Sequence, residues 1–161
     1  MFRITKITDY GVVLLSRLAR GDDRRARNAR DLADELDLPL PTVSKILKTL
    51  ARAGLLASHR GARGGYTLTR DPEKISVAEV IGALEGPVAL TRCSQESEGC
   101  PREGLCGVSA NWQIISDAVR GALHSITLAE MIRPPAEFEK WLGREALGGN
   151  NRNGFHSDDR E

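Results

Sequence analysis

The amino-acid sequence predicts a mainly α protein with a small β-hairpin wing: a winged helix-turn-helix domain followed by a long dimerisation helix. Two predicted helices joined by a short turn stand in the first third of the chain, and the second has a basic outer face. Two short β-strand patterns around a glycine-rich tip follow directly. Further along, an apolar seam at heptad spacing runs from Val108 to Ile126.

Two amphipathic helices are predicted in the first part of the chain. Apolar residues recur at helical spacing in "TDYGVVLLSRLA", which predicts a helix from about Thr8 to Ala19 with Thr8 or Asp9 as its N-cap. Asn28 is a good N-cap for the second helix. The prolines of "LDLPLP" end that helix, because proline does not fit inside one. The second helix has an inward stripe of Leu32, Ala33 and Leu36.

A third helix is predicted from about Pro41 to the C′ glycine Gly54. Its apolar residues, among them Val43, Leu47 and Leu50, form one face. The opposite face is polar and basic: Thr42, Ser44, Lys45, Lys48 and Thr49. A helix, a short turn and a second helix with such a face form the helix-turn-helix pattern.

The stretch "LLASHRGARGGYTLTR" predicts a hairpin with strands Leu55–Ser58 and Tyr66–Thr69. Its glycine-rich tip carries Arg60 and Arg63. A helix fits the major groove of DNA, and arginines on such a tip can enter the narrow minor groove. An ordinary hairpin with solubilising arginines is the alternative. We favour the wing because residues 38–70 hold six Lys and Arg and no acid.

The small net charge of +1 hides an asymmetry along the chain. Residues 1–70 hold 14 Lys and Arg against 7 Asp and Glu, whereas the remainder holds 9 against 15. A local basic surface predicts a polyanion on one face, here double-stranded DNA. A solvated basic surface without a partner is the alternative. The candidate DNA contacts are Thr42, Ser44, Lys45, Lys48, Arg60 and Arg63.

The second half of the chain begins with a predicted helix from about Ser76 to Leu84. After a cysteine-containing loop comes the heptad seam, which favours a dimerisation helix over a helix packed on its own domain. A short helix capped by Thr127 and a tail of disordered composition from about residue 148 follow. The candidate dimer interface is Val108, Trp112, Ile115, Val119 and Ala122.

All three cysteines lie in one loop, as Cys93, Cys100 and Cys106, separated by six and five residues. A disulfide would leave one thiol over, and structural zinc sites usually have closely spaced cysteine pairs and four Cys or His ligands. Iron–sulfur clusters take thiolates, and another side chain can replace one of them. The spacing therefore favours an iron–sulfur cluster, with zinc, redox-active thiols and an incidental cluster of thiols as alternatives.

The chain resembles the Rrf-type regulators, the family of IscR and NsrR, over about residues 1–132. The resemblance rests on "RITKITDYGVVLLSRLA", "LPTVSKILKTLARAGLL", "RGARGGYTLTRDPEKISVAEVIGALEG" and the three-cysteine loop before a long helix. Within the family, "DYGVV", "LPTVSKILK", "EGPVALTRC" and "NWQIIS" are most similar to regulators of the SUF iron–sulfur assembly operon.

The resemblance implies a homodimeric winged-helix transcription factor whose cluster ligands are Cys93, Cys100 and Cys106. The IscR type has a histidine three residues after its last cysteine, where this sequence has Ser109. The NsrR type uses an aspartate of the first helix, donated by the partner subunit, which implies Asp9. A helix N-cap is the plain alternative for Asp9. Weaker candidates are Glu96, Glu98, Glu103, Ser109 and His124. A two-iron cluster is favoured, and a four-iron cluster is the alternative.

These inferences divide the chain into a DNA-binding domain (1–86), a cluster-binding loop (87–107), a dimerisation region (108–132) and a C-terminal extension (133–161). The expected function is a cluster-sensing repressor of SUF-type genes. A nitric-oxide or redox sensor of the NsrR type and a zinc-stabilised DNA-binding module are the alternatives. The sequence has no phosphate loop and no nucleophile arrangement, so we expect neither an enzyme nor a small-molecule substrate. Without a signal peptide or membrane span, the expected location is the cytoplasm.

Overall fold

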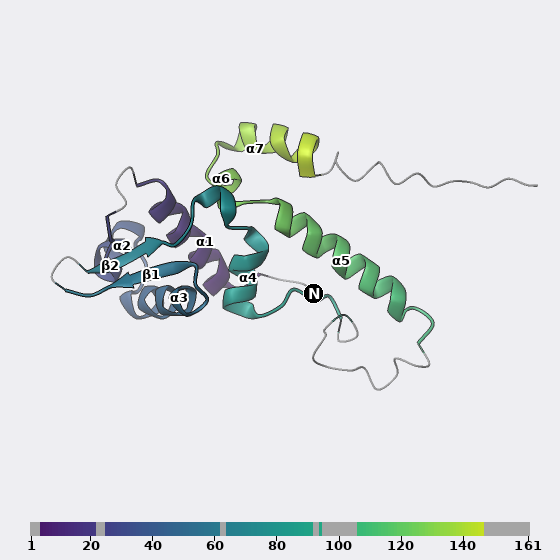
Figure 1. The fold of residues 1–161 in the computed structure, drawn as a ribbon, viewed down its shortest axis with the longest axis horizontal. Helices are drawn as coiled ribbons and strands as arrows, with labels where there is room; N and C mark the ends of the chain where they lie inside the picture. Colours follow the sequence, from purple (N-terminus) through teal and green to yellow (C-terminus); the bar gives the residue numbers. More distant parts are fainter. Residues whose placement is uncertain (1–3, 22–24, 62–63, 92–93, 95–105, 147–161) are drawn as a thin grey trace, which may run out of the picture.

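The computed structural model describes residues 4–21, 25–61, 64–91, 94 and 106–146. In these residues the mainly helical architecture with one two-stranded hairpin confirms the predicted fold class (Figure 1). The elements are α1 (Lys6–Ala19), α2 (Ala29–Leu36), α3 (Leu40–Arg52), β1 (Leu56–His59), β2 (Gly65–Leu68), the 3₁₀ turn η1 (Pro72–Lys74), α4 (Val77–Glu85), α5 (Ser109–Ser125), α6 (Leu128–Met131), α7 (Pro135–Trp141) and the π-helical turn η4 (Leu142–Ala146).

One hydrophobic core joins α1, α2, α3 and the base of the hairpin. The predicted apolar face of α3 is buried in it, and so are Leu32 and Ala33 of α2. In α1 the buried apolar side chains are Leu14 and Leu15, whereas the apolar residues expected beside Leu15 are only half-buried. The helices surround this core while the hairpin extends from one end of the domain (Figure 1). This packing leaves the polar face of α3 outside, as the helix-turn-helix pattern predicts.

Local capping signals place most helix ends. Asn28 caps α2 as predicted, since its side chain accepts a hydrogen bond from Asp31 N at 2.8 Å. The prediction for α1 was wrong: Thr5 is the N-cap, and Asp9 lies in the first turn. Gly54, at φ 77°, ends α3, and Leu55 N donates to Leu50 O at 3.0 Å. Because this Schellman-type bond uses Leu55, β1 begins one residue later than predicted.

The hairpin makes one further contact that the sequence did not predict, an isolated β-bridge on the outer side of β2. Leu56 pairs with Leu68, and His59 pairs with Gly65. On the other side of β2, the Arg27 and Tyr66 backbones exchange hydrogen bonds of 3.0 and 2.9 Å. The segment before α2 thus fixes the hairpin to the helix-turn-helix, because this pairing joins residues 39 positions apart in the sequence.

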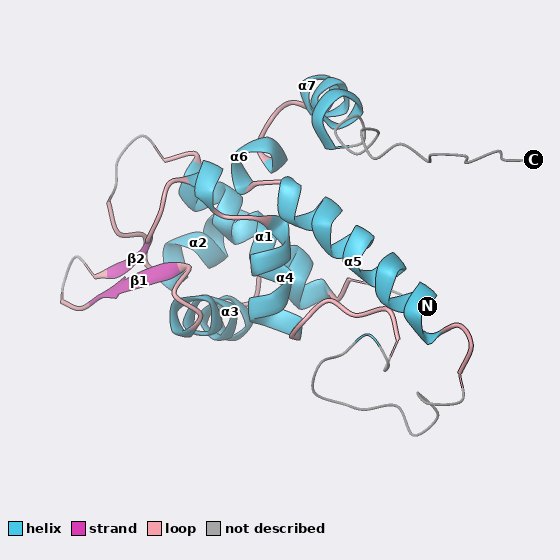
Figure 2. Cartoon of the chain, turned by 45° about the vertical axis from the view of Figure 1, so that its right-hand side comes forward, coloured by secondary structure: helices cyan, strands magenta, loops and turns pink. Residues whose placement is uncertain are grey.

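The C-terminal end of α5 is attached to the winged domain. Val119, Leu123 and Ile126 pack against Val77 and Ile81 of α4. After α5, Leu128 enters the main core with 1% of its surface exposed. The other end of α5 extends away from the domain, as both ribbon views show (Figures 1 and 2). The predicted dimerisation region is therefore continuous with the DNA-binding domain at one end only.

A further helix, α7, which the sequence did not predict, follows the short helix α6 directly after two prolines. Pro134 is its N-cap and Pro135 its first residue. Proline fits at this position because the first backbone N–H groups of a helix have no intrahelical acceptor, so the missing N–H costs no hydrogen bond. Phe138 and Trp141 stack with ring centroids 5.7 Å apart. The predicted tail from residue 148 lies outside the described residues.

No helix in the part of the chain that the structure describes has both the length and the apolar character needed to cross a membrane.

Candidate DNA-binding face and cysteine loop

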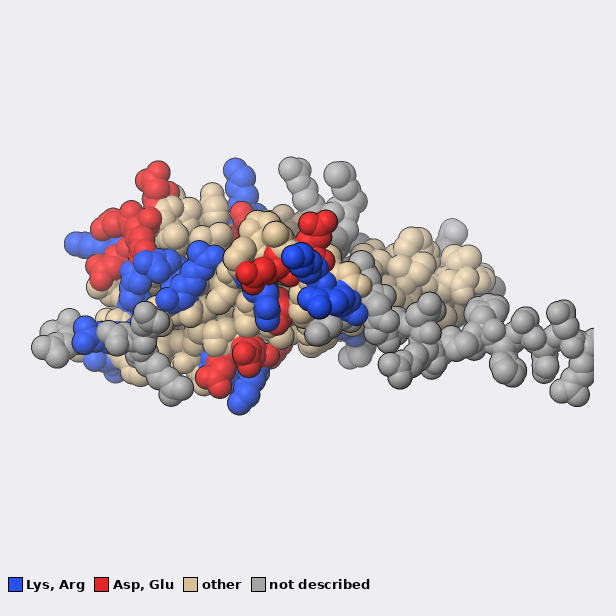
Figure 3. Space-filling view, turned by 90° about the horizontal axis from the view of Figure 1, so that it is seen from above, with Lys and Arg blue, Asp and Glu red and all other residues tan. Residues whose placement is uncertain are grey.

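The outer face of α3 carries cations without acidic partners. Lys45 and Lys48 are exposed, and Thr42 and Ser44 are half-buried beside them. Within the described ranges neither lysine takes part in an ion pair. Figure 3 views the side of α6 and α7, where acidic and basic side chains intermix. The face of α3 therefore has the single-sign charge that attracts a polyanion.

Arg52 belongs to this face, although it was not among the predicted contacts. It is the last residue of α3, is exposed, and follows Lys48 by one helical turn. The 3–4 spacing of Lys45, Lys48 and Arg52 was the signal available in the sequence. Thr49, by contrast, donates its hydroxyl to Lys45 O at 3.0 Å, so that hydroxyl serves its own helix.

The wing presents Arg60, which is exposed and has no ion-pair partner among the described residues. Arg63, the second predicted wing contact, lies outside them. The base of the wing is held by Glu35, which bonds both Arg17 and Arg27. The hydrogen bond from Arg27 is the main reason why the pKa of Glu35 lies below its ordinary value. These ion pairs connect α1, α2 and the bridge to Tyr66.

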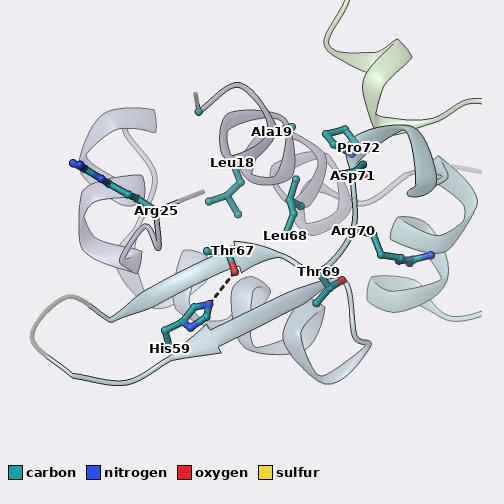
Figure 4. Close-up of a pocket in the computed structure, with 11 residues that line it drawn as sticks. Leu18, Ala19, Arg25, His59, Thr67, Leu68, Thr69, Arg70, Asp71 and Pro72 are labelled. Carbon is teal, nitrogen blue, oxygen red and sulfur yellow. Dashed lines mark hydrogen bonds between the residues drawn. The ribbon is translucent and has the colours of Figure 1, made fainter. Parts of the chain in front are cut away.

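A hollow between the end of α1 and the wing is lined by Leu18, Leu68 and Pro72 together with polar side chains (Figure 4). His59 bonds Thr67 at 2.9 Å across the strands. Arg25 and Arg70 also line the hollow, but their guanidinium groups point outward. The polar groups therefore do not converge on one ligand position, and we place no candidate site there.

Both described ends of the cysteine loop lie along α5. On the entering side, Leu90 N donates to Ser116 Oγ at 3.3 Å, and Ser94 Oγ donates to Trp112 O at 3.3 Å. On the leaving side, Cys106 is half-buried and Ser109, the first residue of α5, donates to its carbonyl oxygen. The loop thus leaves and rejoins the described chain near the N-terminal half of α5.

The predicted ligands have different outcomes. Cys106 and Asp9 are described, and no group of three or more possible metal ligands occurs in the described ranges. His124 is unsuitable as a ligand beside Cys106, because it lies in the last turn of a 17-residue helix that begins three residues after that cysteine, about 25 Å away. The remaining predicted ligands lie outside the described residues: Cys93, Cys100, Glu96, Glu98 and Glu103.

Asp9 is exposed, and its carboxylate has no hydrogen-bond or ion-pair partner among the described residues. The neighbouring turn is held firmly: Glu85 Oε1, at the end of α4, accepts from Thr5 N at 2.9 Å and from the buried Thr8 hydroxyl. Since Glu85 stands two residues before the predicted cluster-binding loop, this contact ties the first turn of α1 to the start of that loop.

Glu85→Gln is expected to lower stability at neutral pH by about 0.5–1 kcal/mol, because it weakens these two bonds at an exposed site. The Thr8 hydroxyl and the Thr5 amide hold the pKa of Glu85 below its ordinary value of 4.5. Its contribution is therefore complete above about pH 4.5 and is lost as the pH falls through the lowered pKa. Urea unfolding across this range checks the effect, with the exposed Glu73→Gln as control. A difference that does not shrink in acid would contradict it.

The predicted dimer seam divides into two parts. Val108, Trp112 and Ile115 are exposed by 52%, 40% and 45%, and Ala122 is also exposed. Val119 instead packs against α4 of its own chain. Ile114, with 66% exposure, joins the exposed apolar surface although the seam did not include it. The N-terminal half of α5 therefore presents unpaired apolar surface, while its other half is anchored in the same chain.

Comparison with known proteins matches most of this chain to one family. The family model described as "Rrf2: Iron-dependent Transcriptional regulator" matches residues 4–134. The protein rrf2 of Nitratidesulfovibrio vulgaris is 30% identical over 131 residues, which cover 81% of this chain and 87% of that protein. The HTH-type transcriptional regulator IscR of Cronobacter sakazakii is 33% identical over 130 residues, covering 81% of this chain and 80% of that protein.

Two solved structures have the same fold. CymR, the global cysteine regulator of B. subtilis, matches with a TM-score of 0.64 and 29% identity over 82% of this chain and 97% of its own. IscR of T. potens matches with a TM-score of 0.61 and 28% identity over 81% of this chain and 86% of its own. The C-terminal α7 lies beyond the matched family region.

Proposed function

Because the chain belongs to the Rrf2 family of transcriptional regulators, and is therefore a DNA-binding regulator and not an enzyme, we propose that it is an iron–sulfur-sensing repressor. It acts as a homodimer on SUF-type iron–sulfur assembly genes. The contacts of both described ends of the cysteine loop with α5 carry this proposal, because they connect the segment that holds the candidate ligands to the helix that presents the exposed apolar surface.

The DNA-binding part of the proposal is supported by α3 and the wing. Lys45, Lys48 and Arg52 form one cationic stripe suited to the phosphates and base edges of the major groove. Arg60 is placed on the wing, where it can reach the next groove. Two such domains in a symmetric dimer require half-sites about 34 Å apart, so the placement of the domains determines operator affinity.

The donor chemistry of the described residues fits an iron–sulfur cluster. Cys106 supplies a thiol that is not buried in the core, just before α5 begins. Cysteine sulfurs are the usual ligands of iron–sulfur clusters. When bound, a cluster would supply a link between thiolates that iron shortage or oxidation breaks. Cys93, Cys100 and Cys106 would hold it, with Asp9 of the partner subunit as the fourth ligand.

The dimer is supported by the exposed apolar part of α5. Val108, Trp112, Ile114 and Ile115 leave the N-terminal half of that helix uncovered, beside the described ends of the cysteine loop. Pairing of two such helices would bury this surface and bring the α1 turn and the cysteine loop of different chains together. Ordering of the loop would then favour one placement of the two winged domains.

Mixed dimers provide the test of this site. Asp9→Ala and Cys106→Ala chains are co-expressed with different tags, and only heterodimers are purified without oxygen. If Asp9 acts across the dimer, one site remains complete, and iron and sulfide should amount to about half of the wild-type content. Both homodimers should lose the visible absorption. A heterodimer as depleted as its parents would exclude donation by the partner, and colourless wild-type protein with stoichiometric zinc would exclude the cluster.

The second candidate is a nitric-oxide sensor of the NsrR type. The carboxylate of Asp9, which has no partner among the described residues, and the serine at position 109 favour it, because the NsrR type uses an aspartate of the first helix where the IscR type uses a histidine. Exposure of the purified protein to nitric oxide or to an iron chelator distinguishes the two. Release of the operator by nitric oxide alone favours the NsrR type, and release by iron removal alone favours the SUF regulator.

A further inference from the structure

We infer that the hydroxyl of Ser76 is the junction that sets the angle of α5 on the winged domain, and that His124 is a positioning residue that acts through it. The structural part of this inference stands on contacts within the chain. Its consequence for operator binding rests on the function proposed above.

The Ser76 hydroxyl is fully used by three partners. It accepts from Glu79 N at 3.2 Å as the N-cap of α4, and it lies 3.2 Å from Glu79 Oε2 and 3.3 Å from His124 Nδ1. A serine hydroxyl donates once and accepts twice. If it donates to the carboxylate, its remaining lone pair accepts from the imidazole, which assigns the proton to Nδ1 of His124. With 7% exposure, Ser76 has little access to water as a substitute partner.

The same junction extends to the wing through Glu79. Its Oε1 accepts from Arg70, which lies just after β2, at 2.8 Å, and Arg70 also donates to Lys74 O at 3.1 Å. Partial burial raises the pKa of Glu79, but the bonds from Ser76 and Arg70 lower it on balance. A continuous series of contacts therefore joins His124 in the last turn of α5 to Arg70 at the end of the wing.

Backbone hydrogen bonds beside Ser76 hold the end of α5 in place, so the helix can tilt about this point. Val77 N donates to Ile126 O, and Leu128 N donates to Ile75 O, both at 2.8 Å. Ser76 and Thr127 face each other in this bridge, and each caps a helix with a complete capping box. The two N-caps thereby fix where α5 ends relative to where α4 begins.

The length of α5 turns a small tilt at Ser76 into a large displacement of its N-terminal end. The 17 residues of α5 span about 25 Å, and Cys106 stands just before its far end. A tilt of about 10° at Ser76 would move that end by about 4 Å. A ligand or partner that tilts the N-terminal half of α5 therefore also strains the contacts of Ser76, and through Glu79 and Arg70 these contacts continue to the end of the wing.

A stability comparison on cluster-free protein tests the contact itself. His124→Phe keeps an aromatic ring but removes the donor, so we expect a rise of about three- to tenfold in the unfolding equilibrium constant. In a Ser76→Ala background the same change should have less than about a twofold effect. His124→Asn should restore the wild-type value, because an asparagine amide reaches the position of Nδ1. Ser125→Ala is the matched control, because the Ser125 hydroxyl donates to Ala122 O of its own helix and to no other atom among the described residues.

The functional readout uses a duplex selected by the purified wild-type protein from a random-sequence library. His124→Phe should reduce, by at least about threefold, the ratio of duplex affinities between cluster-loaded and cluster-free protein, and His124→Asn should retain it. Equal effects of His124→Phe with and without the Ser76→Ala substitution, or an unchanged ratio, would overturn the inference. Failure of the wild type to select any duplex would instead refute the proposed function, while the stability comparison would still decide the contact.

Discussion

Leu128→Ala is expected to lower the free energy of unfolding by about 2–5 kcal/mol. Leu128 has 1% of its surface exposed and belongs to the same cluster as Leu14, Leu15 and Ile75. Its removal would leave a cavity in the core of the winged domain, although it follows α5 in the predicted dimerisation region. The measurement is urea unfolding at one fixed protein concentration, because dissociation of a dimer would otherwise change the apparent stability.

Met131→Ala provides the control for this result. Met131 lies in the same short helix, α6, but is 39% exposed, so its truncation should cost less than about 1 kcal/mol. A single unfolding transition in both variants is expected, since α6 and the winged domain share one core. A second transition, or a loss below about 1 kcal/mol for Leu128→Ala, would mean that α6 is not part of that core.

The parts of the fold that depend on neighbouring residues could be predicted from the sequence. Asn28 caps α2 through a bond to a residue three positions away, and Gly54 ends α3 through its own backbone conformation. The polar face of α3 follows from a 3.6-residue period and needs no knowledge of the rest of the chain. The helix-turn-helix and the hairpin could therefore be predicted from local patterns alone.

Contacts between distant segments could not be predicted in this way. The pairing of Arg27 with Tyr66 and the entry of Leu128 into the core depend on where the chain returns after long excursions. A heptad seam indicates that one face of α5 is apolar, but it does not indicate which segment packs on each residue of that face. The structure covers Val119 with α4 and leaves Trp112 exposed, which periodicity alone does not distinguish.

The candidate site shows the same limit at the level of single residues. An aspartate near the start of a predicted helix is most often a cap, and that role for Asp9 was wrong because Thr5 takes it. The loss of this alternative supports a different role for Asp9, which remains a proposal. Arg52 could be found from its spacing after Lys48, whereas the contact of His124 with Ser76 depends on how α5 returns to α4.

Gly65→Ala is expected to weaken operator binding by about tenfold and to lower stability by about 1–3 kcal/mol. A β-carbon at this position would lie 2.5 Å from the Arg27 carbonyl carbon and oxygen, and 2.8 Å from Asn28 N. These are backbone atoms, so they cannot rotate away as a side chain would. The bridge between Arg27 and Tyr66 must open, and the wing loses the contact that fixes it to the helix-turn-helix.

Two further variants separate the effect of the wing on operator affinity from the effect of the substitution on stability. Gly82→Ala is the same substitution within α4, where an added β-carbon meets no atom within 4 Å among the described residues, so it should keep affinity and gain up to about 1 kcal/mol. Lys45→Ala should keep stability but reduce the slope of log affinity against log salt by about 0.9, because it removes one phosphate contact. If Gly65→Ala kept wild-type affinity while losing stability, the wing would be dispensable for recognition, and the basic stripe on α3 would account for binding alone.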